Sequence, residues 1–252
     1  MPFPSIQVVA PLMLVAVTGS PVLALPPDQV ASKLDTIIVF APINPEFPEK
    51  VLPLNYKLDG QSRSVYFAAF SPSAVEKLIN EKIASQNIDL AKTLKFAPFS
   101  FAKFDSLVQT SLVKDKNSRV IYIPDPEQVN VTERLLIQQG AKRADAVKVA
   151  ASIPAIFCPQ PAIKATPSTG PLKGQAFVPC STDYQTVQGM IKKGLASSAV
   201  LKNSKPKVLA IPMTSFVGLL AKDDKKKVGD IRVLPTPSTI NALEKLRSSK
   251  PE

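Results

Sequence analysis

Short runs of apolar residues recur along this chain, and most of them stop at or next to a proline. In the first half these runs are rich in β-branched and aromatic residues, which is typical of strands. Because proline removes a donor from a strand ladder, such runs suit small sheets better than one extended parallel sheet. The pattern predicts strands at 36–41, 63–70, 94–97 and 119–123.

Segments with helical spacing follow these runs. Ser71-Pro72 has the composition of a helix N-cap and first helical position, and predicts a helix to about residue 85. A second helix is predicted at 101–113. A long helix is predicted after Pro124-Asp125-Pro126, with four apolar residues on one face: Val129, Leu136, Ala144 and Val147. The proline-rich stretches 42–53 and 159–171 are predicted to be exposed loops.

The second half repeats this order, with strands predicted at 153–158, 175–180, 207–211 and 231–234, and helices at 182–197, 213–221 and 237–247. The phrase 123–135 returns as 234–246, an offset of 235 − 124 = 111. Residues 38–42 match 155–159, and 65–71 match 175–181. The helix that follows keeps its apolar spacing at an offset of 112, with Val75, Leu78, Ile79 and Ile83 matching Val187, Met190, Ile191 and Leu195.

This repeat is too long for a solenoid unit and predicts an α/β fold of two similar lobes. The lobes, 25–148 and 149–252, would be related by an internal pseudo-twofold, each a small sheet covered by helices, and would form one structural unit. The alternative is chance similarity among apolar segments punctuated by the chain's 25 prolines.

The amino terminus has the pattern of a secretory signal peptide. Residues 8–17 are apolar except for Pro11, and Val22-Leu23-Ala24 resembles a cleavage site, so residues 1–24 are predicted to be removed. The apolar run is about half the length needed to span a bilayer. No Lys or Arg precedes Val8, which leaves an amino-terminal anchor or a buried segment as alternatives.

The chain has 31 Lys and Arg against 20 Asp and Glu, a net charge of +11, which favours contact with anionic surfaces. The basic residues are scattered except for Lys225-Lys226-Lys227, which is more typical of a solvated turn than of a phosphate or nucleic-acid site. We therefore predict no nucleic-acid partner, and peripheral contact with a membrane remains open.

The residue inventory disfavours an enzyme. The chain has no His, which removes the commonest general base and the commonest metal ligand, and it has no Gly-rich phosphate loop. We predict no catalytic residue, no cofactor and no metal. A hydrolase that works without His is the enzymatic alternative.

Two sets of residues are candidates for a special role. Four phenylalanines follow equivalent strands and predict either core or a nonpolar client-binding groove: Phe99, Phe101, Phe104 and Phe216. Cys158 and Cys180 end two consecutive predicted strands. They predict either a disulfide, for which export is permissive, or two small buried thiols.

One pattern of this chain resembles the Tic22 family: an opening segment, Leu34-Asp35-Thr36-Ile37-Ile38-Val39-Phe40, that starts again later in the chain as Ser152-Ile153-Pro154-Ala155-Ile156-Phe157. In each half, a Phe-containing strand and an amphipathic helix follow. The resemblance covers about residues 34–246. It implies a two-lobed α/β fold with nonpolar pockets and no established catalytic residue. It also implies chaperone-like handling of precursors at a plastid envelope, or of outer-membrane proteins near an Omp85-type barrel. The signal-like start favours the cyanobacterial type, in the periplasm or thylakoid lumen, over the plastid intermembrane space.

These observations lead to one main expectation and two alternatives. The main expectation is an exported, non-enzymatic protein that shields apolar segments of unfolded precursor or outer-membrane proteins. The alternatives are a passive structural adaptor on the envelope and the His-free hydrolase. Full burial of the four phenylalanines would exclude the groove that they predict.

Overall fold

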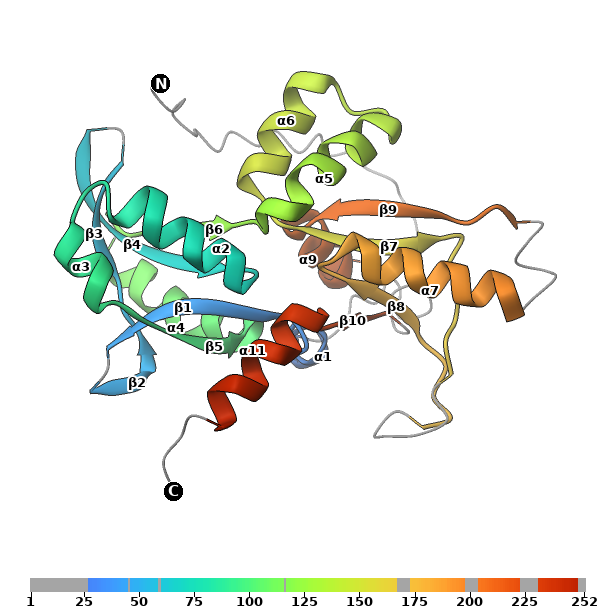
Figure 1. The fold of residues 1–252 in the computed structure, drawn as a ribbon, viewed down its shortest axis with the longest axis horizontal. Coiled ribbons are helices and arrows are strands. Elements are labelled where there is room, and N and C mark those ends of the chain that lie inside the picture. The colour runs from blue at the N-terminus through green and yellow to red at the C-terminus, as the bar shows by residue number, and fades with distance from the viewer. Residues whose placement is uncertain are drawn as a thin grey trace.

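The computed structural model describes residues 27–44, 46–58, 60–115, 117–166, 173–197, 204–222 and 231–248. Over these residues the chain is a mixed α/β fold with two sheets and covering helices (Figure 1). The predicted signal peptide at 1–24 and the lysine cluster at 225–227 lie outside the described residues. Within the described ranges, no helix has both the length and the apolar character that a membrane crossing requires.

The elements of the first half are α1 (Pro27–Leu34), β1 (Ile38–Asn44), β2 (Phe47–Val51), β3 (Leu54–Leu58), β4 (Gln61–Ala69), α2 (Pro72–Lys77), the π-helix η1 (Leu78–Ile83), α3 (Ile88–Thr93), β5 (Lys95–Ser100), α4 (Phe101–Lys114), β6 (Arg119–Ile123), α5 (Pro126–Gln138) and α6 (Arg143–Ser152). Those of the second half are β7 (Ala155–Gln160), β8 (Val178–Ser181), α7 (Tyr184–Ser197), β9 (Lys207–Pro212), α9 (Met213–Lys222), β10 (Ile231–Leu234) and α11 (Pro237–Ser248). Most predicted elements are present, and β6 and β10 have the predicted bounds.

The first sheet is built on four strands in the order β5, β1, β4, β6. β1 is antiparallel to β5 and β4, and β6 is parallel to β4. In the described register β1 and β4 meet at a single pair, Phe40 and Ala69, and beyond it they diverge. β2 pairs with β1, and β3 pairs with β4, along the two diverging edges.

The second sheet has the same strand order and orientations, with β9, β7, β8 and β10 in place of β5, β1, β4 and β6. β7 and β8 also meet at a single described pair, Phe157 and Ser181. Ala69 and Ser181 therefore occupy equivalent places, with an offset of 181 − 69 = 112. The predicted match of 65–71 with 175–181 is wrong by two residues. Ser71 caps α2, and its equivalent is Asp183, whose carboxylate accepts from the Thr186 backbone N–H at 2.7 Å.

Both sheets contribute to one buried core. The largest hydrophobic cluster holds residues of β1 and β4 together with residues of β7, β8 and β10. α4 and α9 lie behind the strands in Figure 1 and insert Phe104 and Phe216 into this cluster. α1 contacts α4, α9 and β10, and adds Leu34 to the same core. Neither sheet therefore has to bury its helices alone.

The last helices of each half cross over to the other half. Leu135 and Leu136 of α5 share a buried cluster with Phe157 of β7. α11 contacts α2, and its Ala242 packs against the cluster that contains Phe40 of β1. This exchange ties the two sheets together.

Two predictions about the first half are wrong. The predicted long helix is two helices, because Gly140 adopts a left-handed φ of +96° between α5 and α6. After this break Ala144 and Val147 are exposed instead of sharing the buried face of Leu136. The predicted loop at 42–53 also contains the end of β1 and the whole of β2.

Prolines within the strands occupy alternate ladder positions. Pro42 of β1 lies opposite Phe96 of β5, and Pro98 of β5 lies opposite Phe40 of β1. Between β7 and β9, Pro159 and Pro212 belong to the same alternate set of residue pairs. In an antiparallel pair the N–H groups of alternate residues point away from the partner strand. A missing N–H at these positions leaves the ladder between the two strands intact, so central strands tolerate proline here.

Candidate functional site

The four candidate phenylalanines do not form a groove. The exposed fractions of Phe99, Phe101, Phe104 and Phe216 are 5%, 5%, 0% and 1%, and all four belong to the shared core. The groove prediction is therefore wrong. It assumed that two small sheets could not bury every apolar helix face, whereas α4 and α9 are buried by a core that both halves build.

Cys158 and Cys180 are joined in a disulfide between the neighbouring strands β7 and β8. Their Cα atoms are 4.4 Å apart and both residues are buried in the shared core. Their place in the interior indicates a structural bond, because reactive cysteines lie in partly exposed, electropositive surroundings.

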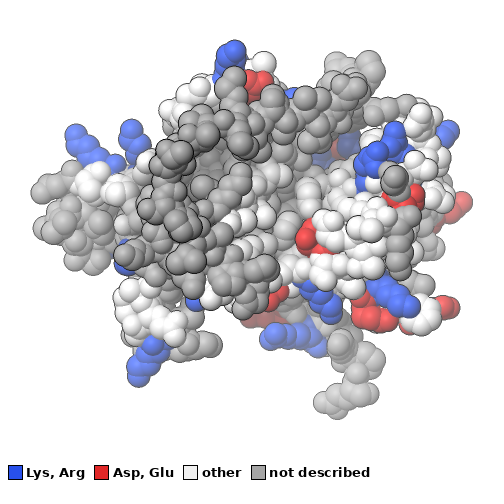
Figure 2. Space-filling model, turned by 180° about the vertical axis from the view of Figure 1, so that it is seen from behind, with Lys and Arg blue, Asp and Glu red and all other residues white. Residues whose placement is uncertain are grey.

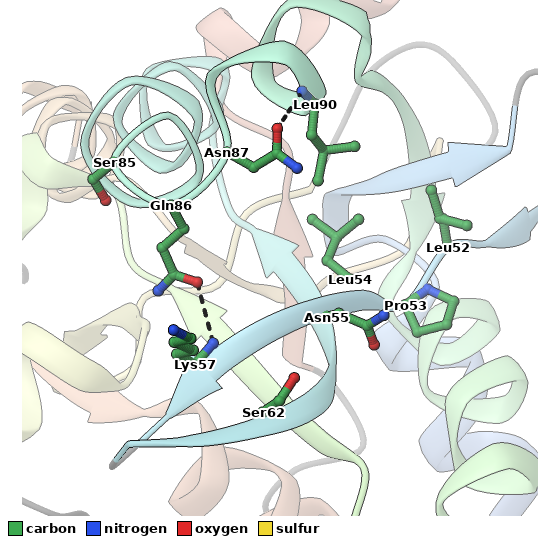
Figure 3. A pocket seen from close by; sticks show the side chains of 10 residues that line it. All are labelled: Leu52, Pro53, Leu54, Asn55, Lys57, Ser62, Ser85, Gln86, Asn87 and Leu90. Atoms are coloured by element: carbon green, nitrogen blue, oxygen red, sulfur yellow. Dashed lines mark hydrogen bonds between the residues drawn. The ribbon is translucent and has the colours of Figure 1, made fainter.

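A hollow of about 630 Å³ lies beside β3, between this strand and the segment that connects η1 to α3 (Figure 3). We call it the β3 hollow. It is lined by Leu52, Pro53, Leu54, Asn55, Lys57, Ser62, Ser85, Gln86, Asn87 and Leu90. Its volume lies in the range of roughly 300–1,000 Å³ that is usual for ligand pockets.

The floor of the β3 hollow is apolar. Leu54 is buried in a cluster with Val65 and Phe67 of β4, and Leu52 and Leu90 pack against that cluster. Figure 3 shows the side chains of Leu54 and Leu90 pointing toward one another across the hollow. Polar side chains and one cation, Lys57, form the rim. Such a lining suits an apolar group whose neighbours are solvated.

Local sequence explains how the two walls are held. Leu58 pairs with Gln61 across a two-residue connection in which Gly60 has a φ of +76°, so β3 and β4 form a tight hairpin. On the opposite wall, the Asn87 side chain caps α3 by accepting from the Leu90 backbone N–H at 2.9 Å. The cap fixes the direction in which α3 leaves η1 and holds Leu90 above β3.

The outer edge of β3 faces the β3 hollow. In a hairpin with a two-residue loop, the residue pair that closes the loop is hydrogen-bonded, and hydrogen-bonded pairs then recur at every second residue. The backbone groups of Leu58, Tyr56 and Leu54 therefore bond to β4. The backbone groups of Asn55 and Lys57 point away from β4. One interaction demonstrates this direction: the Lys57 backbone N–H donates to Gln86 Oε1 at 3.1 Å (Figure 3). Backbone donors and acceptors therefore line one side of the β3 hollow.

Sequence reasoning missed this site. The alternation of Leu54, Tyr56 and Leu58 before Asp59-Gly60 is the signal of a hairpin, and it lies directly after the stretch that was predicted to be a loop. It would have identified β3 as a strand. The hollow itself also needs Gln86 and Leu90, whose approach to β3 is not visible in the local pattern.

The lining can bind but offers little acid–base chemistry. Lys57 is the ionisable residue among those that line the β3 hollow. Among the described residues, no three or more Asp, Glu or Cys side chains gather in a way that could hold a metal ion. Tyr56 lies on β3 with its ring edge-on to Phe67 at 5.5 Å, and burial raises the pKa of its phenol.

Charges on the surface are dispersed. On the face seen in Figure 2, the described Lys and Arg side chains are spaced apart, with Asp and Glu among them. Asp115 illustrates a local effect: hydrogen bonds from the Ser118 hydroxyl at 2.7 Å and the Asn117 backbone N–H at 2.9 Å lower the pKa of its carboxyl. On this face, the described side chains present no concentrated basic patch.

Tyr122 provides a pH test of the shared core. Its ring stacks on Phe101 at 5.8 Å, and burial, with a smaller contribution from the nearby Asp105 charge, raises the pKa of its phenol to about 12. The folded-state pKa lies above the ordinary value near 10. The neutral phenol therefore makes its full contribution to the unfolding free energy at pH values below about 10. This stabilisation is lost as the pH rises through 12, and amounts to about 2–3 kcal/mol.

We expect the unfolding free energy of the native protein to fall more steeply than that of Tyr122→Phe between pH 10 and pH 12. Urea unfolding at pH 9 and at pH 11.5 measures the unfolding free energy of both proteins. Titration of the lysines affects the two proteins equally, so it cancels in the difference between them. Parallel curves would show that Tyr122 is not protected in the fold.

Comparisons with known proteins find likeness in structure alone. No protein-family model matches the chain, and no curated protein matches it in sequence. The solved structure titled "Anabaena Tic22 (protein transport)" matches with a TM-score of 0.65 at 17% identity, over 90% of this chain and 100% of that one. Tic22 from Plasmodium falciparum matches with a TM-score of 0.63 at 17% identity, over 88% of this chain and 99% of that one. The resemblance to Tic22 is thus confirmed at the level of the fold.

Proposed function

We propose that this chain, whose fold is that of the Tic22 proteins, is a non-enzymatic binding protein in protein translocation. The likeness to a solved structure titled as a protein-transport protein, over nearly the full length of both chains, carries this proposal. The β3 hollow supports it, because an apolar floor with a polar rim suits a segment of another polypeptide.

The proposed clients are unfolded precursor or outer-membrane proteins, handled near an Omp85-type barrel, in a periplasm, a thylakoid lumen or a plastid intermembrane space. Export after removal of residues 1–24 and internal duplication of 25–148 as 149–252 are parts of the same proposal. Two observations support duplication: the common strand order of the two sheets and their single-pair contacts at Phe40–Ala69 and Phe157–Ser181.

Aggregation of a urea-denatured outer-membrane barrel protein on dilution provides the test. We expect the mature chain, from residue 25, to suppress light scattering at a several-fold excess, because the β3 hollow shields apolar segments. No suppression by the native chain would contradict the proposal and leave the passive adaptor as the better account.

A matched pair of variants on α3 locates the activity. Leu90 lines the β3 hollow, whereas Ile88, two positions earlier, is 56% exposed and does not line it. We expect Leu90→Glu to weaken suppression about ten-fold and Ile88→Glu to change it less than two-fold. Thermal unfolding of both variants checks that the fold is retained. Equal suppression by both variants would exclude the β3 hollow as the client site.

A further inference from the structure

We propose that the β3 hollow binds an extended polypeptide segment as an added strand on the outer edge of β3. The inference rests on the proposed function and names how a client would be held. Backbone hydrogen bonds would supply sequence-tolerant affinity, and the apolar floor would take one side chain of the segment.

The backbone groups of β3 point in directions that favour this mode of binding. The pairs Leu58–Gln61, Tyr56–Arg63 and Leu54–Val65 use the inward-facing groups of β3, so the N–H and C=O groups of Asn55 and Lys57 face the hollow. Within the described residues, the Lys57 N–H donates to Gln86, and it is the one outward group of Asn55 and Lys57 that has a hydrogen-bond partner. Asn55 and Lys57 lie about 6.8 Å apart along β3, which matches the spacing of alternate residues in an extended chain.

Two other sheet edges, those of β9 and β5, are protected in ways that the edge of β3 is not. At the edge strand β9, both outward groups of Ala210 bond to the Gln139 side chain, which donates to the Ala210 C=O at 2.9 Å and accepts from its N–H at 2.8 Å. At the edge strand β5, Pro98 holds the equivalent position and carries no N–H. Proteins protect sheet edges by such means. At the edge of β3, by contrast, Gln86 bonds one outward group, the Lys57 N–H, and the edge borders the β3 hollow.

The walls of the β3 hollow determine which side chains an added strand can carry. Side chains of an added strand alternate between two faces, so an apolar side chain directed at Leu54 and Leu90 would be followed by one directed at solvent. Lys57 is the charge at the rim and favours an acidic residue in the segment. The occupant is therefore an extended segment with alternate apolar residues and an acidic neighbour, in which the segment's C=O competes with Gln86 for the Lys57 N–H.

Fluorescence anisotropy with the full mature chain tests this mode of binding. The probe is a labelled, capped heptapeptide of alternating Leu and Thr with one Glu. Two derivatives carry N-methyl groups, on the Leu amides in one and on the Thr amides in the other. Because only alternate amides of an added strand face β3, we expect one derivative to lose at least ten-fold in affinity and the other to lose less than three-fold. Equal effects of the two methylation patterns would overturn the proposal.

A proline in β3 supplies the protein-side test. Asn55→Pro removes an outward N–H and spares the ladder with β4, whereas Asn55→Thr retains the N–H and changes only the side chain. We expect at least a ten-fold loss of peptide affinity for Asn55→Pro and less than a three-fold loss for Asn55→Thr, with similar unfolding temperatures. Equal affinity of the two variants would contradict strand addition. If the native chain suppresses aggregation but does not bind the peptide, strand addition fails and the proposed function stands; if it does neither, both fail.

Discussion

Replacing Phe104 with alanine is expected to lower the free energy of unfolding by about 3–5 kcal/mol. Phe104 is fully buried on α4 and belongs to the core that both sheets share. Its loss would leave a cavity where the two halves meet, and a close-packed interior relaxes only partly around such a gap. Phe216 holds the equivalent place on α9 and is 1% exposed, so Phe216→Ala should have an effect of similar size.

Urea unfolding followed by circular dichroism measures this effect, with Leu107→Ala as the control. Leu107 lies one turn along α4 and is 36% exposed, so its truncation should lower the unfolding free energy by about 1 kcal/mol or less. Suppression of client aggregation is measured on the same variants at temperatures and urea concentrations below their unfolding transitions. Under these conditions Phe104→Ala should still suppress aggregation. A Phe104→Ala protein of native stability would contradict this role of Phe104 in the shared core.

The elements that sequence predicts best begin with local signals. Ser71 before Pro72 and Asp125 before Pro126 start α2 and α5, and in each case the side chain accepts a backbone N–H of the helix's first turn. Thr236 does the same for α11, accepting from the Thr239 N–H at 3.1 Å. These signals act within three residues, so one sequence is enough to recognise them.

The features that sequence misses depend on contacts between distant segments. Periodicity carries through Gly140, and by itself it does not show that the long predicted helix ends there. Burial of Phe99 and Phe216 depends on a core built by both sheets, which no local pattern reveals. The β3 hollow likewise needs Leu54 and Leu90, on a strand and a helix that the η1 segment brings together.

The comparison of the two sheets shows the same limit. Matching residues by type places Ser71 against Ser181, whereas the ladder shows that Ala69 is the equivalent of Ser181. With that register Cys180 corresponds to Ala68, and Cys158 corresponds to Ala41, since each cysteine lies next to the residue of its single β7–β8 pair. Both alanines are fully buried in the shared core. The second half thus has a disulfide where the first half has two small apolar residues.

Replacing Cys158 and Cys180 together with alanine is expected to lower the free energy of unfolding by about 3 kcal/mol. The bond spans 22 residues, and a closed loop of that length removes about this much chain entropy from the unfolded state. The double variant should still fold, because Ala41 and Ala68 fill the equivalent sites of the first sheet. Dithiothreitol should lower the unfolding midpoint of the native chain and leave that of the double variant unchanged.

The bond also has a structural reason to occur in this half. In the first sheet, β2 and β3 continue the pairing where β1 and β4 diverge. In the described part of the second sheet, β7 and β8 share one ladder pair, Phe157 and Ser181, next to the bonded cysteines, and a single isolated bridge, Ala165 to Phe177, lies beyond them. The disulfide therefore holds two strands that have little other pairing. Amide exchange resolved by residue should show faster opening of β8 than of β4 once the bond is removed, and equal rates would contradict this role.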